Sequence, residues 1–593
     1  MSKNGVKAHK KKKSKGNKGL SPIEKEKRVQ HNEILSVMRN LGFERVPRVD
    51  GKEFVYKNRT TELDDIFYHE NVVILTEYTV GSSGDHLLKK KIIYDFINED
   101  KRKFLNYLLG ENKFETSLAR FKEVVLKKYH ISKLQIVIMY CSKKKITGEH
   151  KSLVGDVVFF DYPVVKYFES LSKVVKRSAR FEFFDFLGIG FDNVGDNILS
   201  SSTSNNHKFS GHILPEAHSS FQEGYKIVSF YIDATSLLKR SYVLRKDGWK
   251  RKENVGHYQR MLIPSKIKGM RRYLHEKRRV FINNIIATLP IDKVSLYDAD
   301  DELISIDGSG QFVGGGGSKV TPAKIEIKDE TNILGIIDGQ HRIFSYHEGD
   351  DSYENTISKI RNIQNLLVTG ILYPESEKDY NRLKFEAGLF HEINSHQTVA
   401  SSQLRQEIEL MVNPTSATAI AKRILNRLND SGPFDGLFEQ FWFEKNKLKS
   451  ASIISFGLRP LVKLDGDDSL FHAWADKRKN SLKSDNLDED VFDEYINFCV
   501  TEINKLLIQI KMVLTSERWK VSRSDKEAVL NVTTVNGFLN LLRYVIQNDC
   551  ERSEAFYKER VKGLSAFNFK PYKSSQYRRL GEDLFKKLGF GSS

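Results

Sequence analysis

The chain has 593 residues, of which 39% are hydrophobic and 11% aromatic, and its formal net charge is +18. This length predicts roughly two to four domains, and the composition is typical of folded globular proteins and excludes a wholly disordered chain. No apolar run is long enough to cross a bilayer, so we expect a protein without a membrane partner.

Cysteine usage favours a reducing environment. The only cysteines are Cys141, Cys499 and Cys550, and they show no CxxC spacing, which argues against both a disulfide framework and a structural zinc site. The first twenty residues lack the apolar stretch of a secretory signal. We therefore expect a cytoplasmic protein.

Positive charge is concentrated in two segments. Residues 1–30 carry eleven Lys or Arg and two Glu, and residues 245–279 carry thirteen Lys or Arg and three acidic residues. Local basic clusters indicate a polyanionic partner such as DNA or RNA, although a solubilising tail or a solvated helix face gives the same pattern. The candidate nucleic-acid contacts are Lys250, Arg251, Lys268, Arg271 and Arg272.

In chain order, we predict a basic tail over residues 1–28 and an α/β domain over residues 29–190. Helical spacing of Ile34, Leu35, Met38 and Leu41 predicts the first helix. Residues 71–80 are expected to be extended, and apolar runs at 134–141 and 156–162 predict buried strands.

Acidic residues lie before and within the segment 71–80. Asp64 and Asp65 precede it, and Glu77 and Thr79 fall on one of its faces by alternation. A hairpin would bring a carboxylate beside Glu77, and paired carboxylates suit Mg2+. The alternative is an ordinary α/β core with acidic strand ends.

This segment is similar to the restriction-endonuclease-like nuclease fold. In that fold a helix carries an acid, a hairpin carries an Asp, and a strand carries E-x-K. The resemblance implies a Mg2+ site at Glu33, Asp64 and Glu77, with Asp64, Asp65 and Glu77 as catalytic candidates. Thr79 stands where the family has lysine, and Lys90 or its neighbours on the next helix are candidates to replace it.

Residues 191–224 are rich in Ser, Asn, Gly and His without a period and predict a linker. In the domain that follows, over residues 225–410, the apolar run 333–337 predicts a buried strand, and a helix is expected from Arg342. Asp338, Gly339, Gln340, His341 and Arg342 thus occupy a strand-to-helix turn that suits an anion. The alternative is that Asp338 caps the helix and Arg342 pairs with it.

These five residues resemble the motif that names the DGQHR-domain proteins, which include DndB-type components of DNA phosphorothioation systems, and more distantly the ParB/sulfiredoxin-like α+β fold. The resemblance extends to Arg260 upstream and Asn394 downstream. It implies a bound nucleoside triphosphate such as ATP, held by residues 338–342 with Arg260 and Asn394, and turnover aided by Asp338 and His341.

Several segments of residues 411–593 show helical periodicity, which predicts a mainly helical region. The expected architecture is a multidomain α/β protein: a restriction-endonuclease-like domain, a ParB/sulfiredoxin-like DGQHR domain and a mainly helical C-terminal region. The expected function is DNA binding in a prokaryotic modification, restriction or antiviral system, with nuclease or nucleoside triphosphatase activity and other modification or restriction proteins as partners. A non-enzymatic DNA-binding regulator with a vestigial nuclease fold, or an RNA-directed nuclease or adaptor, are the alternatives.

Overall fold

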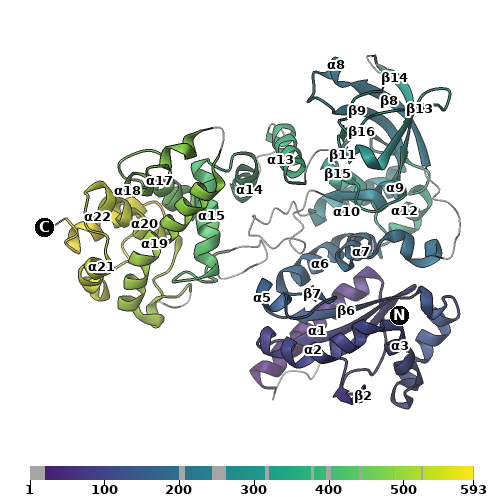
Figure 1. Ribbon diagram of the computed structural model, residues 1–593, viewed down its shortest axis with the longest axis horizontal. Coiled ribbons are helices and arrows are strands. Elements are labelled where there is room, and N and C mark those ends of the chain that lie inside the picture. The colour runs from purple at the N-terminus through teal and green to yellow at the C-terminus, as the bar shows by residue number, and fades with distance from the viewer. Residues whose placement is uncertain are drawn as a thin grey trace, which may run out of the picture.

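The structure of the protein is a computed structural model (Figure 1). It describes residues 20–198, 207–243, 262–313, 319–375, 379–395, 402–439, 444 and 447–591, with gaps at 485–486, 523–524 and 526.

The N-terminal part is a five-stranded sheet between two layers of helices. The strand order is β1 (Glu44–Arg45), β4 (Asp65–His69), β5 (Val72–Thr79), β6 (Gln135–Ser142) and β7 (Val158–Phe160). β4 is antiparallel to β5, whereas β5, β6 and β7 are parallel. The small hairpin of β2 (Phe54–Tyr56) and β3 (Arg59–Thr61) projects from it.

Alternation along β5 and β6 divides the core of this sheet in two. Ile74 and Met139 pack with α1 (Pro22–Leu41), α6 (Tyr162–Val175) and α7 (Arg180–Leu187). Leu75 and Ile138 pack with α2 (Ser83–Glu99), α3 (Lys101–Gly110) and α4 (Glu115–Phe121) on the other face. Continuous apolar runs therefore mark strands that are buried on both faces.

The first helix begins earlier than predicted. Ser21 caps α1 and forms a capping box with Glu24, and Pro22 occupies the first turn. Residues 22–28 therefore belong to the helix, and the predicted tail is wrong for them; residues 1–19 lie outside the described residues.

The middle part contains a nine-stranded mixed sheet. Its order is β10 (Ser241–Val243), β15 (Leu334–Asp338), β11 (Ile285–Pro290), β16 (Asn365–Tyr373), β9 (Lys226–Asp233), β8 (His207–Pro215), β14 (Thr321–Ile327), β12 (Val294–Tyr297) and β13 (Leu303–Ile304). On one face lie α9 (Ala234–Arg240), α10 (Pro264–Lys277), α11 (Gln340–Phe344) and α12 (Glu354–Ile360), and their apolar residues join the same hydrophobic cluster as α1 and α6. The two sheets thus share one core.

Strand β8 overturns the predicted linker. It pairs with both β9 and β14, so residues 207–215 lie inside the sheet. A Cβ on Gly211 would lie 2.0 Å from the carbonyl oxygen of Ser229, so this position needs glycine. The polar, glycine-containing strand therefore resembled a loop in sequence.

The C-terminal part is helical, as predicted, and has its own hydrophobic core from Ile420 to Phe590. Its principal helices are α15 (Ala417–Asp430), α16 (Ser450–Ile453), α17 (Arg459–Val462), α18 (Leu470–Ala473), α19 (Glu489–Arg518), α20 (Val532–Gln547), α21 (Glu554–Arg560) and α22 (Tyr577–Lys587). Figure 1 shows α13 (Asp379–Ser395) and α14 (Ser402–Val412) between this part and the two sheets. Among the described residues, no helix has both the length and the apolar character needed to cross a membrane.

Candidate functional site

Two of the predicted acids and the predicted lysine meet on the α2 face of the N-terminal sheet. Asp64 immediately precedes β4, and its carboxylate accepts a hydrogen bond of 2.6 Å from the backbone N–H of Tyr78. Glu77 lies on β5 and is 3% exposed. Lys90 on α2 places its Nζ 2.8 Å from Glu77 Oε1 and 3.3 Å from the carbonyl oxygen of Glu62. We call Asp64, Glu77 and Lys90 the acid–lysine site.

Burial changes the protonation of both acids. It raises the pKa of Glu77 to about 8, an effect that the charge of Lys90 opposes and that of Asp64 reinforces. It also raises the pKa of Asp64 to about 6, against the hydrogen bond from Tyr78 and the charge of Lys90. The two carboxyl groups therefore retain protons at a higher pH than exposed carboxylates do, and a bound cation would favour their release.

A histidine and a tyrosine adjoin this site. The parallel register pairs Glu77 with Tyr140 on β6, and the hydroxyl of Tyr140 lies 2.9 Å from His86 Nδ1. His86 precedes Lys90 by one helical turn. Burial lowers its pKa to about 4, and the charges of Lys90, Lys89 and Lys27 act in the same direction. The imidazole is therefore neutral at pH 7, and sequence spacing gave no sign of this pair.

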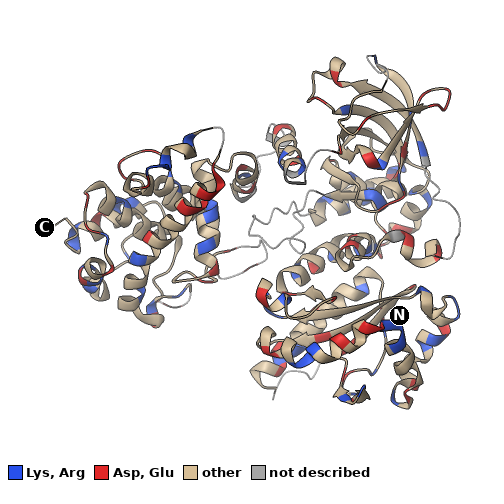
Figure 2. Cartoon of the chain, in the orientation of Figure 1, with Lys and Arg blue, Asp and Glu red and all other residues tan. Residues whose placement is uncertain are grey.

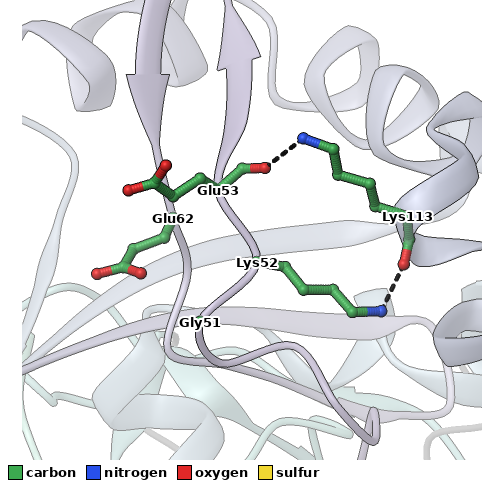
Figure 3. Close-up of a pocket in the computed structure, with 5 residues that line it drawn as sticks. All are labelled: Gly51, Lys52, Glu53, Glu62 and Lys113. Carbon is green, nitrogen blue, oxygen red and sulfur yellow. Dashed lines mark hydrogen bonds between the residues drawn. The ribbon is translucent and has the colours of Figure 1, made fainter.

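An open pocket of about 600 Å³ adjoins the acid–lysine site. Figure 3 shows its lining residues, which are Gly51, Lys52, Glu53, Glu62 and Lys113. Lys113 donates a hydrogen bond of 2.7 Å to the carbonyl oxygen of Glu53. Glu62 links the pocket to the site because its carbonyl accepts from Lys90 and its carboxylate raises the pKa of both Asp64 and Glu77. Lysine and glutamate thus surround an opening large enough for a nucleotide-sized group.

Asp65 does not belong to this site, which corrects one predicted catalytic residue. It is fully buried and faces α1, where it contacts His31 Nε2 at 2.9 Å, the Tyr78 hydroxyl at 2.8 Å and Arg45. Neighbouring residues of a strand point to opposite faces, so Asp64 and Asp65 cannot act together.

Glu33 is also absent from the acid–lysine site, which corrects the predicted metal ligands. It pairs with Lys143 at 2.6 Å and with Lys166 at 2.7 Å. Within the part of the chain that the structure describes, no group of three or more His, Cys, Asp or Glu side chains is arranged to hold a metal ion. The acids that remain for a cation are Asp64 and Glu77.

The DGQHR residues occupy a strand-to-helix turn, as predicted, but the helix begins at Gln340 rather than at Arg342. Gly339 has a φ of 100°, and a Cβ there would lie 2.9 Å from Ile285 Cγ1. Its backbone conformation and its surroundings therefore both require glycine.

Protein groups hold the side chains of His341 and Arg342. The N–H of Ile263 donates to His341 Nε2 at 3.0 Å. Arg342 Nη2 donates to Asp338 Oδ2 and to the carbonyl oxygen of Asn284, both at 2.9 Å. The alternative in which Arg342 pairs with Asp338 is therefore confirmed. Its other half is wrong, because Gly339 occupies the N-cap position and no side chain caps the helix.

Gln340 differs from its neighbours in this turn. It is 2% exposed, and neither its amide nitrogen nor its amide oxygen has a hydrogen-bond partner among the described residues. A buried amide without partners is unfavourable by about 1–3 kcal/mol, so it points to a group that the described residues do not supply.

The predicted nucleic-acid contacts separate into two kinds. Arg271 on α10 is 1% exposed and contacts Asp351 at 2.7 and 2.9 Å and Glu354 at 2.9 Å. It is therefore a structural residue, and the prediction that it contacts nucleic acid is wrong. Lys268 and Arg272 on the same helix are exposed.

Four predicted site residues lie wholly or partly outside the described residues. Lys250, Arg251 and Arg260 fall in the undescribed segment 244–261, and Asn394 lies in the last turn of α13 with its side chain outside the described part.

A scan of protein-family models, a search of curated proteins and a search of solved structures each find no match to this chain.

Proposed function

We propose that the protein is a DNA-associated phosphodiesterase whose N-terminal domain cleaves DNA at the acid–lysine site, within a modification, restriction or antiviral system. The observation that carries this proposal is the 2.8 Å contact between Lys90 and Glu77 with Asp64 beside them. The restriction-endonuclease-like fold has a lysine where this chain has Thr79. Here Lys90 on α2 supplies the ammonium group that contacts Glu77 instead.

The residues present fit a magnesium ion. Mg2+ is commonly bound through one or two carboxylates and keeps several waters, and Asp64 and Glu77 supply two carboxylates. When bound, it would lower the pKa of a coordinated water and stabilise charge on the phosphate. The ion would also displace the protons that burial retains on the two acids.

Lys90 orients the substrate in this proposal. Its ammonium group has three donors, of which one meets Glu77 and another the carbonyl oxygen of Glu62. The third donor is available for a non-bridging oxygen of the scissile phosphate. Lys52 and Lys113 at the pocket wall would attract the flanking phosphates.

The pH dependence of stability tests the cation site without an activity assay. The folded pKa values of about 6 and about 8 exceed the ordinary values of 3.8 and 4.5. Without a cation the pair therefore favours the folded state at low pH, and this contribution is lost as pH rises through the folded values. Mg2+ replaces the protons, so its stabilising effect should grow as pH rises from below 6 to above 8. Thermal unfolding with and without Mg2+ measures this effect.

The control for that measurement is Glu77→Gln, which removes one ligand and one titrating group. We expect it to abolish the pH-dependent part of the Mg2+ effect. An equal Mg2+ effect in wild type and Glu77→Gln would contradict the cation site. Cleavage of plasmid, linear and single-stranded DNA in Mg2+ or Mn2+ then tests the activity. If the protein binds DNA but cleaves none of these forms, the alternative of a DNA-binding regulator with a vestigial nuclease fold is favoured.

A nucleoside triphosphate at the DGQHR turn is a second candidate function, favoured by the unpartnered amide of Gln340. A purine or cytosine edge would supply the donor and the acceptor that this amide lacks. Under this proposal the protein binds a nucleotide through Gln340 while Arg342 stays paired with Asp338.

The variant Gln340→Met separates this candidate from a structural role, since it keeps the side-chain length and removes both polar atoms. We expect it to lose nucleotide binding by at least about tenfold, and to raise the free energy of unfolding in the absence of nucleotide by about 1 kcal/mol. Calorimetry with ATP, GTP and CTP and a urea titration measure the two effects. Unchanged binding of all three nucleotides, or no binding by wild type, would remove the candidate.

A further inference from the structure

The segment between α10 and β11, residues 278–284, carries an unusually exposed apolar side chain. Ile282 is 90% exposed, more than any other large hydrophobic residue that the structure describes. A second isoleucine, Ile363, is 70% exposed in the turn before β16. β11 and β16 are parallel neighbours that pair Ile285 with Val368. The two turns that precede these strands therefore lie at the same end of the sheet. We call residues 278–284 the isoleucine tip.

The tip is anchored on both sides of Ile282. On one side the ring of Phe281 stacks on Tyr273 at 5.5 Å. On the other, Asn284 Nδ2 donates to Thr369 Oγ1 at 3.0 Å, and the carbonyl oxygen of Asn284 accepts from Arg342 at 2.9 Å. These contacts fix the residues around Ile282, so its exposure is a property of the folded tip.

The DGQHR turn contacts the base of the isoleucine tip, which its sequence did not indicate. Arg342 joins Asp338 to the carbonyl oxygen of Asn284, and Asp338 itself pairs with Ile286 across β15 and β11. The turn thus connects the end of β15 to the base of the isoleucine tip.

Positive charge lies along α10 and at the start of the tip. Along α10 and just after it, six cationic side chains are exposed and have no carboxylate partner among the described residues: Lys266, Lys268, Arg272, Lys277, Arg278 and Arg279. The same helix carries a single acid, Glu276. Over most other elements Lys and Arg are interspersed with Asp and Glu, as Figure 2 shows. This segment is therefore complementary to a polyanion.

We propose that the isoleucine tip is a DNA contact, in which Ile282 enters a base step of a duplex while Arg278, Arg279 and the exposed cations of α10 neutralise the flanking phosphates. This inference rests on the proposed association with DNA and names the surface that makes it. Aliphatic side chains flanked by cations unstack base steps and bend DNA from the minor groove. An exposed isoleucine alone fits any apolar partner, and the unpaired cations select the nucleic acid.

The experiment measures affinity, bending and salt dependence with the full chain. The probe is a duplex that carries a fluorescent base analogue at its centre and a donor and acceptor dye at its ends. We expect wild type to unstack the base and bend the duplex. Ile282→Ala should abolish both signals and weaken binding about tenfold while the salt slope stays unchanged. The pair Arg278→Ala and Arg279→Ala should reduce the slope of log K against log salt by about 2.

Two further variants complete the design. Ile508→Ala removes the same atoms from a partly exposed isoleucine on α19 in the C-terminal part, and it should leave every signal unchanged. Arg342→Met keeps the aliphatic stem but loses both hydrogen bonds of Nη2, to Asp338 and to Asn284, so it should reduce bending as Ile282→Ala does. The variant that combines the Arg342 substitution with Ile282→Ala should bend DNA no less than Ile282→Ala alone.

The outcomes distinguish this inference from the proposed function. If Ile282→Ala binds and bends DNA as wild type does, the tip contact is overturned while the DNA association stands. If wild type binds no nucleic acid, both are overturned. Binding to anionic phospholipid vesicles that requires Ile282, without DNA bending, would assign the tip to a membrane surface and overturn the inference.

Discussion

Glu77→Gln should reduce Mg2+-dependent DNA cleavage by at least about 10²- to 10³-fold, because it removes a metal ligand and the partner that orients Lys90. Glutamine keeps the size of the side chain and one oxygen, so the buried site should remain packed. Lys90→Ala should have an effect of similar size through the lost contact with the phosphate. Initial rates of plasmid nicking at saturating DNA measure both variants, and filter binding at low salt measures whether DNA affinity is retained.

The matched control is Glu53→Gln, which neutralises an acid at the wall of the same pocket without touching Glu77 or Lys90. We expect it to cleave within a few-fold of wild type. Equal activity of Glu77→Gln and Glu53→Gln would contradict the acid–lysine site as the catalytic centre. Loss of cleavage in Asp65→Asn without loss of stability would instead favour the opposite face of the sheet.

Arg271→Ala should destabilise the middle sheet by about 3–5 kcal/mol, the range expected when one partner is removed from a buried ion pair. Arg271 is 1% exposed, and its guanidinium contacts two carboxylates and the carbonyl oxygens of Ser345 and His347. Its removal takes the ion-pair partner from Asp351 and leaves Glu354 with Arg361 alone. Urea unfolding followed by fluorescence gives the change in the free energy of unfolding.

The neighbouring Arg272→Ala provides the control, since Arg272 is exposed on the same helix. It should change the free energy of unfolding by no more than about 0.5 kcal/mol. It should also weaken DNA binding and reduce the slope of log K against log salt, because one phosphate contact is lost. A pattern in which Arg271→Ala stays stable and loses only DNA affinity would restore its predicted role as a nucleic-acid contact.

The sequence by itself determined the local elements near both candidate sites. The extended segment 71–80 and the apolar run 134–141 became β5 and β6, and the run at 333–337 followed by Asp-Gly became β15 and the turn before α11. These predictions succeeded because strands buried on both faces need continuous apolar residues, and because glycine permits the positive φ at which such a turn begins. The helical C-terminal part followed from periodicity in the same way.

The tertiary structure alone decided which polar residues meet. Asp64 and Asp65 are equivalent in sequence, but the side of β4 that each faces assigns one to Lys90 and Glu77 and the other to Arg45 and His31. Arg271 and Arg272 likewise differ only in the direction of their side chains from α10. Which side chains meet depends on contacts between residues that are far apart in the chain. Composition and local spacing carry no information about those contacts.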